Sequence, residues 1–345
     1  MKEWFKNIVR IGNTARLYIR VGTAGLTIRK FYVLVRYWFL TAILRKHIPW
    51  LIELSVTYRC QCRCKHCSVS NYFTEADRAR ELSYDDIVGI LKDAVKMGIP
   101  KIDYFGGEPL IKERIVDLVR EASQLGIYIS VTTNGLMLTQ QMIRDLKAAG
   151  ISCINISLDS ASQEEHDRLR GKDGLYDKVI TAIKDCHDAG VACIVSTYVT
   201  RRRINNFATA QDDSELTAII DLSKSLKATG IRILFPIISG EWEKKKEIEL
   251  NDSEKKRVIE NIDHSFAFIE GAYSVVQKKK TCQALSGKLI NISPYGDMQL
   301  CIAFPKSFGN LKELSLKELM HKMWEHPIYQ KNKNSDCCST EGLKT

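Results

Sequence analysis

Long apolar runs are scarce in this 345-residue sequence. The longest lies between Phe31 and Leu44 and is interrupted by Arg36, whereas a helix needs about 20 apolar residues to cross a bilayer. No small-residue cleavage site follows it, so we expect no secretory signal peptide. Eleven cysteines are too few for a disulfide scaffold at this length, and their clustering indicates metal chemistry in a reducing compartment. These absences predict a cytoplasmic protein.

Acidic side chains are nearly missing from the first 50 positions, where Glu3 stands against ten Lys or Arg. The other 295 residues carry 41 basic and 40 acidic side chains, so the net charge of +10 belongs almost entirely to residues 1–50. This basic, aromatic-rich segment fits a helical extension that contacts an anionic membrane surface, on the cytoplasmic face. Two alternatives are helices packed on the main domain and an RNA-binding arm. Nucleic acid is the least favoured partner.

Three cysteines, Cys60, Cys64 and Cys67, follow one another at intervals that let a single loop bring three thiolates to one metal centre. A structural zinc site would need a fourth ligand nearby, but the next cysteine along the chain is Cys153. Soft thiolates select cubane iron-sulfur clusters, and three ligands leave one iron open for a substrate or cofactor. Cys62 fits neither interval, so we predict that it is not a ligand.

This cysteine loop resembles the hallmark of the radical S-adenosylmethionine (radical SAM) superfamily, except that His66 stands where another aromatic is common. The resemblance implies a 4Fe-4S cluster on Cys60, Cys64 and Cys67, with S-adenosylmethionine bound to the fourth iron. It also implies an electron donor such as flavodoxin or ferredoxin. Reductive cleavage would then yield a 5′-deoxyadenosyl radical that removes hydrogen from an unactivated carbon.

Residues 51–236 repeat a short β-branched run followed by an amphipathic stretch. Six such units predict a parallel sheet with right-handed crossovers, and the resemblance implies the same open, TIM-like partial (β/α)6 barrel in an α/β protein. We expect strands at Ile52–Thr57, Lys101–Phe105, Tyr128–Thr132, Cys153–Leu158, Val191–Val199 and Ile231–Phe235. The helices expected between them are Tyr84–Met97, Lys112–Gln124, Thr139–Ala149, Asp177–Ala189 and Ser214–Ala228.

Further motifs follow the expected strands, where chemistry gathers in such folds. Gly106, Gly107, Glu108 and Pro109 match the family segment that holds the methionine amino group of S-adenosylmethionine. By the same resemblance, the other cofactor contacts are Asn134, Ser157 and Arg170. Simple turn chemistry for the glycine segment and a solvated Arg170 are the alternatives.

We make predictions for two more groups of residues. Arg201, Arg202 and Arg203 follow the fifth strand and form a solvated loop or meet an acidic substrate group. Three lone thiols are expected in the core, namely Cys153, Cys186 and Cys193.

The C-terminal part divides into a linker with a helix at residues 237–280 and a small domain at residues 281–345. We expect Asp252 or Ser253 to cap this helix, which reaches to about Glu270. A hairpin with its turn at Gly296 follows. Four cysteines accompany it, and together with the hairpin they resemble the SPASM or twitch extension, which implies a second, auxiliary iron-sulfur cluster. Zinc is the alternative metal for these four residues, which are Cys282, Cys301, Cys337 and Cys338.

The cysteines do not select the substrate. The N-terminal segment favours a membrane-associated lipid or isoprenoid, and maturation of a peptide, protein or tetrapyrrole is the next hypothesis. Other classes stay open: a non-catalytic iron-sulfur or zinc scaffold, or an RNA-modifying enzyme.

Overall fold

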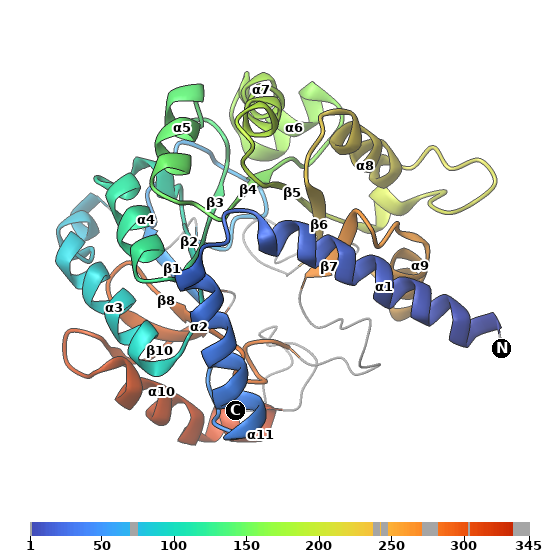
Figure 1. Cartoon of the computed structure of the whole chain (residues 1–345). Coiled ribbons are helices and arrows are strands. Elements are labelled where there is room, and N and C mark those ends of the chain that lie inside the picture. Colours follow the sequence, from blue (N-terminus) through green and yellow to red (C-terminus); the bar gives the residue numbers. More distant parts are fainter. Residues whose placement is uncertain are drawn as a thin grey trace.

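The computed structural model describes residues 2–69, 75–236, 242, 248–270, 282–302 and 304–333. A curled ten-stranded sheet, in the order β10-β9-β8-β1-β2-β3-β4-β5-β6-β7, forms its centre. Helices cover the outer face of this sheet, and the chain forms a partial barrel (Figure 1). The predicted α/β partial barrel is therefore confirmed.

All six predicted strands are present, and each pairs in parallel with the next. They are β1 (Leu51–Thr57), β2 (Lys101–Gly106), β3 (Tyr128–Thr133), β4 (Cys153–Ser157), β5 (Cys193–Tyr198) and β6 (Gly230–Leu234). The predicted helices are present too, and the sequence between β4 and β5 forms two helices in place of one. These are α3 (Tyr84–Met97), α4 (Ile115–Gln124), α5 (Gln140–Ala148), α6 (Gln163–Arg170), α7 (Leu175–Asp188) and α8 (Glu215–Ser225).

Burial on both faces explains why these segments are strands. Ile52, Leu54 and Val56 of β1 are fully buried and point to the helices, while the alternate residues face the barrel interior. Local signals begin the helices: at α3 the Ser83 side chain accepts a hydrogen bond from the Asp86 N–H, and the Asp86 carboxylate accepts one from the Ser83 N–H. The burial pattern of the strands and the caps of the helices therefore predict the same element boundaries.

The helix predicted to reach about Glu270 is wrong at its C-terminal end. Asn251, one residue before the predicted cap, caps α9, which spans Asp252–Asn261 and so ends nine residues earlier than predicted. The Asp263 carboxylate accepts hydrogen bonds from the N–H and hydroxyl of Ser265, which turns the chain. It then forms β7 (Ala267–Glu270), parallel to β6. The alternating burial of a four-residue strand is too short to separate from helical periodicity in the sequence.

The predicted hairpin is confirmed, with its turn at Gly296, and it extends the barrel sheet. β8 (Leu289–Ile292) pairs in parallel with β1, β9 (Asp297–Cys301) pairs antiparallel with β8, and β10 (Phe304–Asn310) pairs with β9. Two helices follow, α10 (Leu316–Glu325) and α11 (Pro327–Asn332). Ser315 caps α10.

The N-terminal segment forms α1 (Lys2–Thr23), α2 (Ile28–Trp38) and a π-helix (Phe39–Ile43) that cross the front of the barrel in Figure 1. Its basic side chains donate to carbonyl groups just before strands: Arg36 to Val95 and Lys96, Arg29 to Gln124, and Arg20 to Thr229 and Ser265. Carbonyls at helix C-termini attract cations, so this charge stabilises the packing.

Lys30 of α2 is nearly fully buried, and its ammonium group donates to the Gly25 and Gly150 carbonyls and to the Ser152 hydroxyl. Helices packed on the main domain were one of the two alternatives to membrane contact. This packing explains the buried side of the N-terminal segment. Within the described ranges, no helix is both long and apolar enough to cross a membrane.

A belt of polar side chains crosses the inner face of the sheet at one level. Asp103 accepts hydrogen bonds from the hydroxyls of Ser130 and Thr132. Arg232 donates to the Ser196 hydroxyl and pairs with Glu270 at 2.8 Å. The inner positions of eight strands contribute to this polar belt, which consists of Glu53, Asp103, Ser130, Asn155, Ser196, Arg232, Glu270 and Asn291.

We expect Glu53→Gln to stabilise the fold near pH 8. Burial and the charges of Glu270 and Asp103 raise the pKa of the half-buried Glu53 to about 8, from an ordinary 4.5. Between those values the folded state holds a proton that the unfolded state releases, so the wild-type free energy of unfolding falls as pH rises. Glutamine does not titrate, so the variant lacks this pH dependence and its free energy of unfolding is about 2 kcal/mol higher than that of the wild type at pH 8. Denaturant unfolding of both proteins at pH 5 and pH 8 measures the difference.

The control is Glu164→Gln, because Glu164 is an exposed carboxylate on α6. It should keep the wild-type pH dependence. If Glu53→Gln also kept that dependence, Glu53 would not titrate between these pH values in the folded protein.

Candidate active site

The loop of Cys60, Cys64 and Cys67 lies at the C-terminal edge of the sheet, directly after β1. Backbone bonds fix it against α6: the Arg63 N–H donates to the Arg170 carbonyl at 2.9 Å, and the Lys65 N–H donates to the Leu169 carbonyl at 3.1 Å. Two segments distant in the sequence therefore form one wall of the site.

Neighbouring hydrogen-bond donors act to lower the pKa of two thiols in this loop, and burial opposes them. Cys60 is exposed, while Cys64 and Cys67 are half-buried. A hydrogen bond from Cys62 lowers the pKa of Cys60 to about 6, although burial opposes it, and the Asn134 amide, 3.6 Å from Cys60 Sγ, acts in the same direction. Burial raises the pKa of Cys64 to about 11, and the Arg170 guanidinium, 3.7 Å from Cys64 Sγ, opposes that shift.

Cys62 differs from its neighbours in burial and in its pKa. It is buried, and its hydrogen bond to Cys60 raises its own pKa far above the usual range. A thiol that stays protonated is a poor ligand, since the thiolate is the form that binds metal. That Cys62 is not a ligand stays a prediction.

The chemistry of the donor set fits an iron-sulfur cluster. Three cysteines share one loop, two of them contact the donors Asn134 and Arg170, and no carboxylate or imidazole forms part of the set. Soft thiolates alone suit such a cluster. In the part of the chain that the structure describes, no three Cys, His, Asp or Glu side chains already converge as a closed metal site.

The glycine segment approaches the cysteine loop so closely that side chains cannot fit. A Cβ atom at Gly106 would lie 2.2 Å from the Thr57 carbonyl oxygen, and one at Gly107 would lie 2.2 Å from that of Arg59. The Gly107 and Glu108 N–H groups donate to these same two carbonyls. Glycine is therefore required at this crossing of backbones.

Glu108 is fully buried and links the loops after β2 and β3. Its carboxylate accepts hydrogen bonds from the Thr133 hydroxyl, the Asn134 N–H and the Leu110 N–H. Burial raises its pKa to about 7, and these three donors oppose the shift. Pro109 begins a short 3₁₀ helix, Pro109–Ile111. In the structure the carboxylate thus positions Asn134, whereas the predicted contact of Glu108 with an ammonium group stays a prediction.

Arg170 is buried, so the solvated alternative is wrong. Its Nε lies 2.6 Å from the carboxylate of Asp159, which follows β4. Burial would raise the pKa of Asp159, but the charge of Arg170 outweighs it and holds the pKa well below the usual range. His66 Nε2 lies 3.6 Å from the same carboxylate, and burial lowers the pKa of His66 to about 4, which keeps the imidazole neutral.

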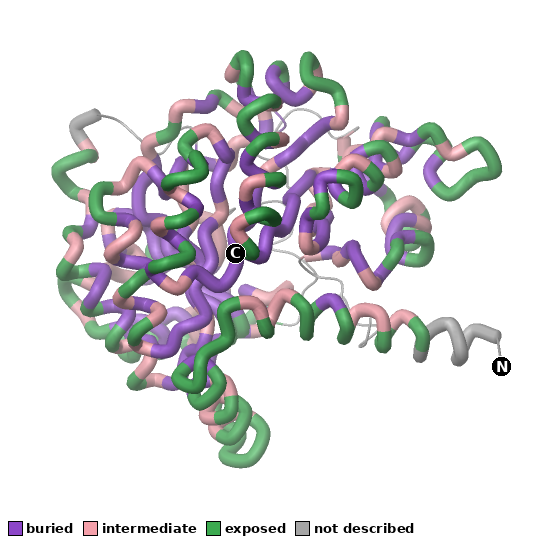
Figure 2. The backbone as a smooth tube through the Cα atoms, turned by 45° about the horizontal axis from the view of Figure 1, so that its top comes forward, coloured by how far each residue is buried: buried purple, intermediate pink, exposed green. Residues whose placement is uncertain are grey.

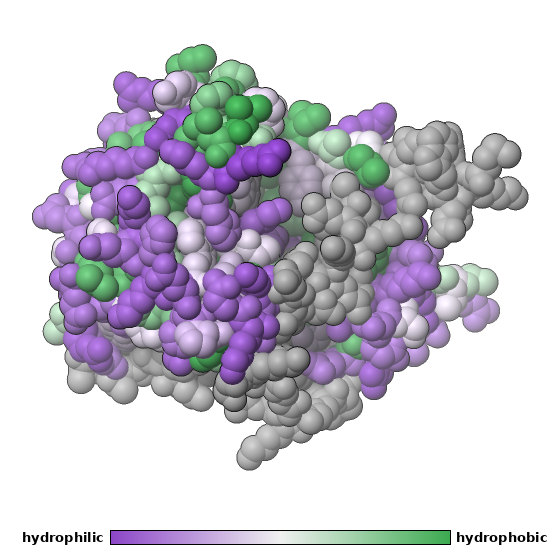
Figure 3. Space-filling model, turned by 90° about the horizontal axis from the view of Figure 1, so that it is seen from below, coloured by the Kyte–Doolittle hydropathy of each residue, from purple (hydrophilic) through white to green (hydrophobic). Residues whose placement is uncertain are grey.

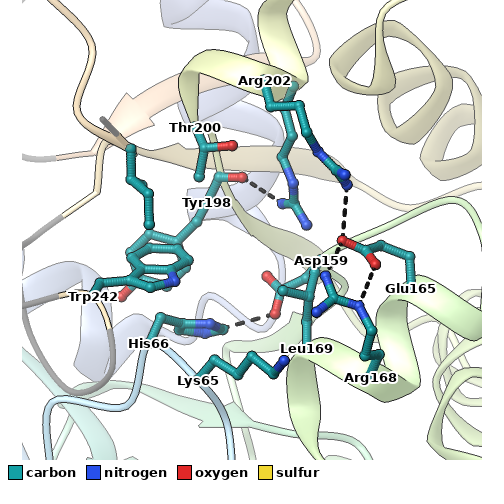
Figure 4. A pocket seen from close by; sticks show the side chains of 12 residues that line it. Lys65, His66, Asp159, Glu165, Arg168, Leu169, Tyr198, Thr200, Arg202 and Trp242 are labelled. Carbon is teal, nitrogen blue, oxygen red and sulfur yellow. Dashed lines mark hydrogen bonds and ion pairs between the residues drawn. The ribbon is translucent and has the colours of Figure 1, made fainter. Parts of the chain in front are cut away.

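A cavity of about 330 Å³ opens beside this cluster. Figure 4 shows His66, Tyr198 and Trp242 together on one side of it, with Asp159 opposite His66. The His66 ring lies 4.7 Å from that of Tyr198 and 5.1 Å from that of Trp242. Charged side chains form much of the remaining wall, among them Lys65, Glu165, Arg168, Arg202 and Arg203.

The structure corrects the prediction of a solvated loop only at Arg203, because Arg201 and Arg202 are exposed. These residues form a 3₁₀ helix, Arg201–Ile204, and each arginine pairs within the protein. Arg201 binds Glu254, Arg202 binds Glu165, and the buried Arg203 donates to the Tyr198 carbonyl.

The remaining predicted positions divide into three sets. Ser157 lies half-buried at the end of β4, in register with Ser196 of β5. The lone thiols are buried as predicted, at Cys153, Cys186 and Cys193. Of the auxiliary set, Cys301 ends β9 and both it and Cys282 are half-buried, whereas Cys337 and Cys338 lie outside the described residues.

Sequence reasoning missed several residues of this site. Asp159 lies two positions after Ser157, which ends β4. Polar residues at the C-terminal ends of parallel strands are candidates for site residues, so this position could have predicted Asp159. Tyr198, at the end of β5, had the same signal. Nothing in the local sequence indicated that Trp242 would reach His66.

A partial barrel with a three-cysteine loop after its first strand defines an iron-sulfur enzyme of the S-adenosylmethionine-dependent class. Comparison with known proteins agrees, because residues 54–206 match the Radical SAM superfamily. Residues 54–206 form a radical SAM domain, so the chain is a radical SAM enzyme, and members of this family use a 4Fe-4S cluster and S-adenosylmethionine.

Three similar proteins illustrate the match. The AdoMet-dependent heme synthase of Methanosarcina barkeri is 27% identical over 234 residues, which are 68% of this chain and 62% of that protein. The PqqA peptide cyclase of Rhizobium meliloti is 26% identical over 291 residues, 79% of this chain and 74% of the relative. Streptococcus suis SuiB, in a crystal structure bound to precursor peptide SuiA, has the same fold with a TM-score of 0.66 at 19% identity. That match covers 86% of this chain and 72% of SuiB.

Proposed function

We propose that this radical SAM enzyme acts on a peptide or protein. When bound, the cluster and S-adenosylmethionine supply a 5′-deoxyadenosyl radical that abstracts hydrogen from carbon. Cys60, Cys64 and Cys67 would hold the cluster, and Gly106, Gly107, Asn134, Ser157 and Arg170 would orient the cofactor. Glu108 and Pro109 shape the loop that presents these glycines. An external one-electron donor, a flavodoxin or ferredoxin, belongs to the proposal.

The proposal of a peptide substrate is argued from the residues that line the cavity. Lys65, Glu165, Arg168 and Arg202 are charged, and the aromatic rings of His66, Tyr198 and Trp242 supply flat contact area. Charged and amide groups of a peptide match such a wall, whereas an isoprenoid chain needs an apolar one. The peptide-modifying relatives support the same choice.

The position of the N-terminal segment in the fold does not support the predicted lipid or isoprenoid substrate. That hypothesis rested on the N-terminal segment, whose bonds to Lys96, Gln124 and Thr229 lie just before β2, β3 and β6. The cysteine loop follows β1, so it lies at the opposite edge of the sheet. The segment therefore does not deliver a substrate to the cavity directly.

An auxiliary iron-sulfur cluster near Cys282 and Cys301, completed from Cys337 and Cys338, is part of the proposal. Both described cysteines pack against the main core. Iron and sulfide analysis of a C60A/C64A/C67A variant tests it: residual iron with sulfide supports a second cluster, and zinc without sulfide contradicts it.

The substrate class is tested with the reduced, anaerobic enzyme and S-adenosylmethionine. We expect a peptide fraction from the source cells to raise 5′-deoxyadenosine formation, and protease treatment of that fraction to remove the effect. Mass spectrometry should then find a peptide with an altered mass. Stimulation by a protease-resistant lipid extract would contradict the peptide assignment while leaving the radical chemistry intact.

A further inference from the structure

Large hydrophobic side chains are exposed almost only in the N-terminal segment. Among the described residues, every such side chain except Met137 belongs to residues 9–50. Ile28 is 80% exposed, Tyr32 66% and Trp38 60%. Contiguous apolar surface of this kind marks an interaction site, because it is costly to leave in water.

The two sides of α2 and the π-helix have different partners. Lys30 and Val33 are buried against the barrel, and Leu40 packs on the same core. The opposite side, here called the outer face, repeats at helical spacing and consists of Ile28, Phe31, Tyr32, Val35, Trp38, Phe39 and Ile43. Hydrophobic side chains cluster at the upper edge of Figure 3, where α2 lies, and Figure 2 shows this helix largely exposed at the lower edge.

Within the N-terminal segment that carries the outer face, nearly all the charge is positive. No acidic residue occurs between Glu3 and Glu53. Arg16, Arg45 and Lys46 are exposed, and in the described chain their side chains form no ion pair or hydrogen bond. Basic residues beside exposed Trp, Tyr and Phe are the composition of helices that lie in the interface of anionic membranes.

We propose that the outer face of α2 and the π-helix docks the enzyme on an anionic lipid surface. The helix lies in the plane of the interface, its aromatic and aliphatic side chains enter the headgroup region, and Arg45 and Lys46 meet lipid phosphates. A second copy of the chain fits less well, because a symmetric contact would bring the same positive charges together. The face is also a convex ridge on one helix, which suits a deformable surface.

Docking in this way fixes the orientation of the active site. Arg29 and Arg36 tie α2 to carbonyls that precede β3 and β2, at the edge of the sheet opposite the cysteine loop. The membrane-bound enzyme therefore turns its cavity towards the aqueous side. This orientation accepts a soluble peptide, and the docking itself does not depend on that substrate assignment.

The test is flotation of the anaerobically purified full chain with vesicles of phosphatidylcholine, alone or mixed with phosphatidylglycerol. We expect binding to the mixed vesicles that weakens as salt is raised. The variant F31E/V35E should lose this binding, and R45Q/K46Q should lower it about thirtyfold, at about 1 kcal/mol for each basic side chain. M137E is the matched control, because Met137 is exposed on a different part of the surface.

Two further measurements separate the outcomes. Formation of 5′-deoxyadenosine by each variant shows that its fold is intact, since α2 takes no part in the cavity. Light scattering without lipid detects self-association. The proposal is overturned if the wild type floats with neither vesicle, if F31E/V35E floats as well as the wild type, or if a wild-type dimer becomes a monomer in F31E/V35E. The last result would assign the face to a second copy.

Discussion

Replacing any one of Cys60, Cys64 and Cys67 with alanine lowers 5′-deoxyadenosine formation at least about a thousandfold, to the background of the assay. In the proposed assignment each thiolate is one of three protein ligands to the cluster, and a cluster with two ligands has no defined open iron. The measurement is product formation from S-adenosylmethionine after anaerobic reconstitution and reduction. Iron and sulfide contents of the same samples show whether the cluster or a later step is lost.

Cys62→Ala is the matched control, since Cys62 lies in the same loop and is a buried thiol. We expect it to keep the iron and sulfide of the wild type and most of its activity. Removing the hydrogen bond to Cys60 should raise the pKa of Cys60, so cluster assembly should need a higher pH. Loss of the cluster in C62A, with retention in one of the three alanine variants, would reverse the ligand assignment.

Asp159→Asn should lower the free energy of unfolding by about 3–5 kcal/mol. The substitution leaves the buried Arg170 guanidinium without the carboxylate that lies 2.6 Å away. An uncompensated charge in the interior costs far more than the lost attraction between two exposed groups. Arg170 also contacts Cys64, so the variant should bind S-adenosylmethionine more weakly as well. Chemical denaturation of the purified protein measures the stability change.

Two controls show whether the loss of stability in Asp159→Asn comes from the burial of the pair or from the loss of any ion pair. Asp93→Asn breaks the exposed pair with Lys96, at 3.1 Å, and should cost less than about 1 kcal/mol. The double variant D159L/R170M replaces the buried pair with apolar groups of similar size and should recover most of the stability, though not cofactor binding. Equal costs for Asp159→Asn and Asp93→Asn would show that Asp159 is not effectively buried beside Arg170.

The repeating units of the barrel were predictable because each rests on local signals. The run Ile52–Thr57 can be buried on both faces only in a parallel sheet, and Ser83 with Asp86 begins the following helix from its own side chains. β7 was missed because it lacks such signals: it has four residues, and pairing with β6, which no local pattern records, makes it a strand. The hairpin that contains β8 was predicted, but its pairing with β1 was not.

The candidate site shows the same division. Cys60, Cys64 and Cys67 share one loop, so their spacing alone indicated a common centre. Trp242 lies against His66, which is far from it in the sequence, so no local pattern records this contact. Asp159 and Arg170 are eleven positions apart, and whether Arg170 is solvated or buried depends on the helix α6 that places it against Asp159.

By itself, the sequence determined the chemistry, because thiolate spacing, a glycine segment and strand periodicity are short-range properties that survive without knowledge of neighbours. Only the tertiary structure decided how the N-terminal charge is used. Lys30, Arg29 and Arg36 turn inward to helix carbonyls, whereas Phe31, Val35 and Trp38 remain at the surface. Composition cannot separate those two sets, since burial depends on what packs against each side of a helix.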